Sequence, residues 1–175
     1  DQHAFLQVAA EDDLQVGDLL CFDVSHPCLT FDKWRHLLVI DDHYRVVDGA
    51  DAGHRDLTWI RRMAQDRGAN VKVTDTTTQY GCLGVWGPNA RTTIQKIADE
   101  PEAWTNENFP FAALRNLTIK GVPVLAFRIS YVGEQGWELH FKYEDGLALC
   151  DALYSLGVTP VGVETYANSR RMEKS

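Results

Sequence analysis

The chain has 175 residues with 17 basic and 25 acidic side chains, which gives a formal net charge of −8. This acidic balance argues against a nucleic-acid-binding surface, which needs clustered cations to displace counterions from phosphate. No apolar run approaches the roughly 20 residues of a membrane helix, and the polar start at Asp1 is not typical of a secretory leader. We therefore expect a cytoplasmic chain with no nucleic-acid partner and no membrane partner, and its length allows one domain or two small ones.

The first part of the chain has the spacing of strands and turns. Its apolar residues come in short bursts separated by turn residues, and these bursts are Leu19–Phe22, Leu37–Ile40 and Tyr44–Val47. Bursts of this length predict strands, not helices.

The pattern changes after residue 50. Apolar side chains recur at helical spacing between residues 52 and 68, which predicts a helix with Asp51 as N-cap and Gly68 as terminator. Its inward face is expected to carry Leu57, Ile60, Met63 and Ala64. A strand over 71–74 is predicted to follow.

From residue 82 onwards, strands and helices are mixed. Pro88 is expected at the first position of a helix that buries Ala90, Ile94, Ile97 and Ala98, and Lys120-Gly121 reads as a hairpin turn. The remaining predicted elements are strands over 82–86, 116–119, 122–131 and 137–142, and a helix over 144–156. This order predicts an α+β fold, an antiparallel sheet with flanking helices, preceded by a small all-β segment.

The sequence predicts the buried faces of one strand and one helix. The strand over 137–142 is expected to bury Trp137, Leu139 and Phe141 and to place Glu138 and His140 on its other face. The helix over 144–156 is expected to turn four side chains inward, namely Leu147, Cys150, Leu153 and Tyr154.

The four cysteines, Cys21, Cys28, Cys82 and Cys150, form no CxxC pair, so neither a zinc ribbon nor a thioredoxin-type motif is indicated. This usage fits a reducing cytoplasm. Cys82 and Cys150 lie in apolar patterns, where we interpret them as small packing residues.

One turn carries a chemically suggestive cluster. The segment 131–138, YVGEQGWE, holds a phenol and two carboxylates close together around two glycines. A carboxylate can accept from two adjacent N–H groups of a flat heteroaromatic ring while an aromatic side chain covers the ring face. Solvated glutamates beside a packed tyrosine are the alternative interpretation.

Ordered blocks within residues 50–174 carry a family resemblance. They are Thr74-Asp75, GCLGVWGPNAR at 81–91, FPFA at 109–112, the segment from Tyr131 to Leu139, and NSRRMEK at 168–174. Together they resemble the folate-binding domain of glycine cleavage T proteins (aminomethyltransferases), and more closely its fused version at the C-terminal end of dimethylglycine and sarcosine dehydrogenases.

The resemblance implies tetrahydrofolate as cofactor and assigns residues to its site. Glu138 would accept from the pterin N–H groups, Tyr131 would supply an aromatic wall, Arg171 would offer planar donors, and Glu134 is a weaker candidate. Arg170 stands where the family has an apolar leucine, and the family's catalytic aspartate has no convincing counterpart. The resemblance therefore implies an incomplete domain whose catalytic residues are unknown.

The N-terminal part resembles a different family. Gly17–Phe22, Ser25–Arg35 and Tyr44–Asp48 are similar to the C-terminal β-domain of D-threonine aldolase and D-serine dehydratase type enzymes. That resemblance implies His26 and Cys28 as zinc ligands, and the alternative is an ordinary His-Pro-Cys turn.

The two resemblances predict a junction near residues 48–50, with a β-rich segment over 1–49 and a partial folate-binding domain over 50–175. Three functions remain open: a domain for aminomethyl transfer to folate, a non-catalytic folate-binding or interaction module, and a chimeric fragment with a vestigial zinc site of a D-amino-acid lyase or dehydratase. A further copy of the chain and a flavoprotein dehydrogenase both remain open as partners.

Overall fold

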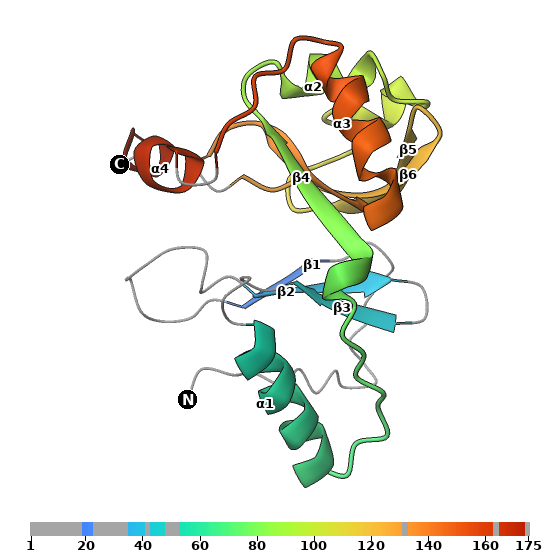
Figure 1. Cartoon of the computed structure of the whole chain (residues 1–175), viewed down its shortest axis with the longest axis vertical. Helices are drawn as coiled ribbons and strands as arrows, with labels where there is room; N and C mark the ends of the chain where they lie inside the picture. Colours follow the sequence, from blue (N-terminus) through green and yellow to red (C-terminus); the bar gives the residue numbers. More distant parts are fainter. Residues whose placement is uncertain are drawn as a thin grey trace. The chain divides into compact units, whose positions relative to one another are not determined.

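The computed structural model describes residues 19–22, 35–40, 43–47, 53–130, 133–162 and 165–173. These residues belong to two compact units, one ending at Thr76 and the other beginning at Thr77 (Figure 1). The predicted domain boundary at residues 49 and 50 remains a prediction. Within the described ranges, no helix is long and apolar enough to cross a membrane.

The first unit holds a small antiparallel sheet and one helix. Strands β1 (Leu19–Phe22), β2 (Arg35–Ile40) and β3 (His43–Val47) pair in the order β1-β2-β3, which confirms the predicted strands. Helix α1 (Gly53–Asp66) confirms the predicted helix, and Gly68 follows it with a positive φ of 61°. Of its predicted inward face, Ala64 is buried and the other three side chains are half-buried.

The strand predicted over 71–74 is wrong. These residues form no regular element, and no described strand pairs with them. Val71 is 61% exposed. The β-propensity of the two valines therefore lacks the cross-strand packing from which strands gain most of their stability.

The second unit is built on a four-stranded antiparallel sheet in the order β4-β7-β6-β5. A 3₁₀ turn, η2 (Thr77–Gln79), leads into β4 (Tyr80–Trp86), and β5 (Leu114–Ile119), β6 (Val122–Phe127) and β7 (Gly136–Lys142) complete the sheet. The α+β class with antiparallel pairing is thus confirmed. Lys120 and Gly121 both have positive φ, 48° and 77°, as a type I′ hairpin turn requires.

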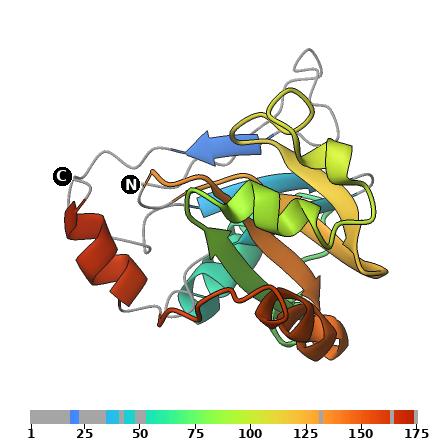
Figure 2. The ribbon, with the colours of Figure 1, turned by 90° about the horizontal axis from the view of Figure 1, so that it is seen from above.

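Helices cover one face of this sheet. They are α2 (Ala90–Gln95) and α3 (Gly146–Tyr154), with the 3₁₀ turns η3 (Pro101–Trp104) and η4 (Tyr143–Asp145) beside them (Figures 1 and 2). The core between helices and sheet centres on Trp104, Phe109 and Trp137, whose ring centroids lie 5.4 to 5.9 Å apart. The π-helical segment η5 (Thr165–Arg170) and α4 (Arg171–Glu173) end the described chain.

Two details of the helices differ from the sequence predictions. Helix α2 begins at Ala90 with Asn89 as N-cap, so Pro88 precedes the helix because Gly87, with φ 128°, forms a turn first. Helix α3 buries Leu149 and Leu153, whereas Leu147 and Tyr154, predicted to point inward, are 75% and 59% exposed.

Candidate functional site

The sheet face opposite the helices carries a small group of polar side chains. Trp137, Leu139 and Phe141 of β7 point into the core, as predicted, so Glu138 and His140 lie on the opposite face. The register places Cys82 of β4 opposite His140, and Gly84 opposite Glu138. Strand pairing over seven residues therefore brings together groups 58 positions apart in the sequence.

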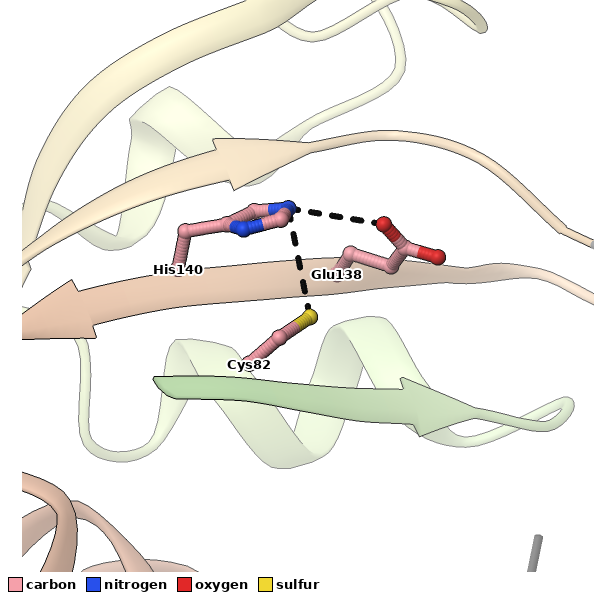
Figure 3. Close-up of side chains that lie close together, drawn as sticks. All are labelled: Cys82, Glu138 and His140. Atoms are coloured by element: carbon pink, nitrogen blue, oxygen red, sulfur yellow. Dashed lines mark hydrogen bonds and ion pairs between the residues drawn. The ribbon is translucent and has the colours of Figure 1, made fainter. Parts of the chain in front are cut away.

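Cys82, Glu138 and His140 form a compact cluster on this face (Figure 3). Nε2 of His140 lies 3.4 Å from Oε2 of Glu138 and 3.9 Å from Sγ of Cys82. His140 is buried, Glu138 is half-buried and Cys82 is exposed. The three ligand-type atoms lie within 4.8 Å of one another, so one small cation could contact all of them.

The surroundings of Cys82 favour its neutral thiol. Desolvation by neighbouring protein atoms, followed by the negative charge of Glu138, raises the pKa of the Cys82 thiol above its ordinary value. The residue also keeps an exposed surface. In the absence of a cation, Cys82 is therefore a poor thiolate nucleophile at neutral pH.

An aromatic pair stands next to this cluster. Gly84 has no side chain, and the space above it is filled by the ring of Trp86 on the same strand face. Trp86 stacks on Tyr166 with ring centroids 4.5 Å apart, and its indole N–H donates to the Ile129 carbonyl at 2.9 Å. These contacts place an aromatic surface beside the strand position that pairs with Glu138.

The same stack attaches the C-terminal segment to the sheet. Tyr166 lies in η5, and Arg170 at the end of η5 forms an ion pair with Glu134, which precedes β7. Arg170 also binds Glu173 at 2.8 Å, and the hydrogen bond with Glu134 is the main reason that the pKa of Arg170 is raised. Arg171, the first residue of α4, directly follows Arg170, which is bound to Glu134.

The predicted site residues are only partly described. Tyr131, His26 and Cys28 lie outside the described residues, as does the side chain of Arg171, so their roles remain predictions. Glu134 and Glu138 are both described and half-buried. Arg170, which the resemblance does not assign to the site, is the arginine whose side chain contacts Glu134.

The sequence interpretation missed the cluster around His140. The packing role predicted for Cys82 is wrong, because Cys82 is exposed and lies outside the hydrophobic core. Strand alternation correctly placed Glu138 and His140 on one face of the strand, and this alternation is the part of the cluster that the sequence could reveal. Adding Cys82 required the β4–β7 register, which no local pattern supplies.

Comparison with known proteins identifies two families. Residues 37–175 match the family described as GCVT N-terminal domain, and residues 1–40 match the putative serine dehydratase domain. The two matches correspond to the two resemblances drawn from the sequence.

Similar proteins include human mitochondrial dimethylglycine dehydrogenase, 38% identical over 75% of this chain, and an aminomethyltransferase of Shouchella clausii, 33% identical over 67%. The chain spans only 15% and 30% of these two proteins. Among solved structures, the chain resembles heterotetrameric sarcosine oxidase from Corynebacterium sp. U-96 in complex with pyrrole 2-carboxylate, with a TM-score of 0.56. The match covers 85% of this chain and 69% of the sarcosine oxidase chain. At 17% identity this match shows the fold alone. Since the first family match extends over most of the sequence, the chain belongs to the GCVT N-terminal domain family.

Proposed function

We propose that this chain is a tetrahydrofolate-binding module related to one-carbon (aminomethyl) transfer, with Glu138 as the principal contact of the pterin ring. The observation that carries the proposal is the position of the C-terminal segment. The Trp86–Tyr166 stack and the Glu134–Arg170 ion pair hold this segment against the end of the sheet from which Glu138 projects.

Glu138 has the chemistry that a pterin needs. Its half-buried carboxylate lies on the face of β7 that is not covered by α2 and α3. A carboxylate in such a setting can accept from the amino group and the neighbouring ring N–H of a pterin, and hydrogen bonds to a charged group are the stronger kind. Tyr131 is the proposed aromatic wall, and Arg171 the proposed donor to an anionic or carbonyl group of the folate.

The structure suggests a positioning role for Glu134. Because its carboxylate is held by Arg170, Glu134 serves to fix α4 near the start of β7 more directly than to bind folate. Fixing a binding segment before the ligand arrives lowers the entropy cost of binding. The proposal therefore assigns direct contacts to Glu138, Tyr131 and Arg171 and assigns preorganisation to Glu134.

Activity, partners and location belong to the same proposal. The chain spans a small part of its relatives, so we propose folate binding first and leave aminomethyl transfer as the activity of a larger assembly. The heterotetrameric state named for the sarcosine oxidase supports a flavoprotein dehydrogenase or a further copy of the chain as partner.

The mitochondrial location named for the human relative does not support the predicted cytoplasmic location. A zinc site at His26 and Cys28 has only the family match of residues 1–40 in its favour.

Calorimetric titration of the full chain with reduced tetrahydrofolate, in the presence of a chelator, tests the proposal. We expect saturable binding that Glu138→Gln weakens by about tenfold or more, because a lost hydrogen bond to a charged group costs about 1.5–3 kcal/mol. Glu107→Gln, at an exposed glutamate in a loop, is the matched control and should bind like wild type. Absence of heat at high micromolar folate, or equal affinity of the two variants, would rule the proposal out.

A further inference from the structure

We propose that Cys82, Glu138 and His140 form a zinc-binding site on the face of the second sheet opposite α2 and α3. The proposal uses residues other than His26 and Cys28, and it does not depend on folate binding. It shares only Glu138 with the proposed pterin contacts.

The donor set suits zinc. Zn²⁺ takes thiolate sulfur, imidazole nitrogen and carboxylate oxygen, and a site with three protein ligands keeps one position for water or a ligand. Cys82, His140 and Glu138 supply one donor of each kind from two paired strands (Figure 3). A thiolate with an imidazole favours zinc over magnesium or calcium, which prefer all-oxygen sites.

The distances also fit. Tetrahedral zinc with ordinary bond lengths separates its nitrogen and oxygen ligands by about 3.4 Å and its sulfur and nitrogen ligands by about 3.6 Å. The His140 Nε2 to Glu138 Oε2 distance is 3.4 Å, and the Cys82 Sγ to His140 Nε2 distance is 3.9 Å. Closing the second distance requires a movement of about 0.3 Å, which side-chain torsions on fixed strands can provide.

The fold holds the ligands in place and leaves a path for the ion. His140 is buried and sits between β4 and β6 in the sheet, opposite Cys82 on one side and Leu125 on the other. Ligands on paired strands are positioned more rigidly than ligands on loops. Cys82 is exposed, so a hydrated ion can reach the sulfur from solvent. On binding, the thiol proton is released to solvent and the sulfur binds zinc as thiolate.

Cobalt is the probe for the test, because a thiolate bound to Co²⁺ gives a charge-transfer absorption that nitrogen and oxygen ligands do not. The full chain is stripped with a chelator, titrated with Co²⁺, and then titrated with Zn²⁺ to displace the cobalt. We expect one equivalent of Co²⁺ with the sulfur band, and Zn²⁺ should abolish the band by replacing the cobalt.

Four variants locate the band. Cys82→Ser changes an exposed residue and should remove the sulfur band and weaken binding by at least about 100-fold, since even indirect partners of metal ligands change affinity by 10–100-fold. Cys150→Ser, the matched control on α3, and the double variant His26→Ala/Cys28→Ala should both keep the band. His140→Gln should weaken binding as Cys82→Ser does, and where it impairs folding, Cys82→Ser decides.

A band that persists in Cys82→Ser, or a wild-type chain without a cobalt band, would overturn the proposal. The variants also separate it from folate binding. Cys82→Ser leaves Glu138 intact and should bind tetrahydrofolate in the presence of chelator as wild type does. Failure of the cobalt titration would thus leave the folate proposal standing, and a negative folate titration would leave the zinc proposal standing.

Discussion

Gly84 offers a sharp test of how the site face is built. The ring of Trp86 occupies the space in which a Cβ at position 84 would lie. Gly84→Ala must therefore either strain the packing or displace the ring. The ring does not move freely, because it stacks on Tyr166 and its indole N–H donates to Ile129.

Both routes have a similar cost. Overpacking with the ring in place costs about 1–3 kcal/mol. Displacing the ring loses an aromatic pair worth about 0.5–1.5 kcal/mol and a hydrogen bond with a net value of about 0.5–1.5 kcal/mol. Alanine is better than glycine within a strand by roughly 0.5–1 kcal/mol, which offsets part of this. We expect a net loss of about 1–2 kcal/mol in the free energy of unfolding.

The sign should reverse when the ring is absent. In a Trp86→Ala background the clash with the ring is removed, so Gly84→Ala should be neutral or should stabilise the protein by up to about 1 kcal/mol. Gly162→Ala serves as control, because none of the described residues places an atom within 4 Å of a Cβ at that position. Urea unfolding followed by circular dichroism and tryptophan fluorescence would measure the four differences.

Unfolding of Gly84→Ala at the same urea concentration as wild type would show that the Trp86 ring does not restrict position 84. An equal loss in the presence and absence of Trp86 would show the same, because the cost would then come from the strand itself.

Three further predictions concern particular residues. Leu149→Ala, at a fully buried position of α3, should lower the free energy of unfolding measured in urea by about 2–5 kcal/mol. Leu147→Ala, at a 75% exposed position, should change it by less than about 0.5 kcal/mol. Equal effects would mean that Leu149 and Leu147 are not on the buried and exposed faces of α3. Gly121→Ala, at φ 77° in the hairpin turn, should cost about 1–2 kcal/mol by the same measurement, and an unchanged midpoint would refute the left-handed turn. In metal-free protein, the raised pKa keeps the Cys82 thiol protonated at pH 8, so the rate of its alkylation by iodoacetamide should keep rising well above pH 9. Glu138→Gln removes a charge that raises this pKa, so the variant should be alkylated faster than wild type at pH 8. A rate that levels off near pH 9 in both proteins, read by mass spectrometry of the Cys82 peptide, would contradict the shift.

Local signals predicted much of the fold. The helix ending near Gly68 and the turn at Lys120-Gly121 follow from side chains within a few residues of one another, and both are found. Helix α3 shows the limit of such signals. Its sequence GLALCDALY is apolar nearly all round, so no single face stands out, and the position of the sheet selects Leu149 and Leu153 for burial.

The candidate site was predictable only in part, for a related reason. A family resemblance identified Glu138, and strand alternation placed His140 beside it. Cys82 joins them through the pairing of β4 with β7, which is a tertiary contact between residues 58 positions apart. Likewise, the Glu134–Arg170 pair depends on how the C-terminal segment returns to the sheet, and neither charge signals this in the sequence.

The two faces of β7 explain why core and chemistry coexist on one strand. Alternation sends Trp137, Leu139 and Phe141 into the core, and this apolar set fixes the register, since a slip by one residue would bury Glu138 among them. The same register sets Cys82 opposite His140. The burial that stabilises one face therefore aligns the ligands on the other, so a variant that shifts β4 against β7 should lose the cobalt band even with all three ligands present.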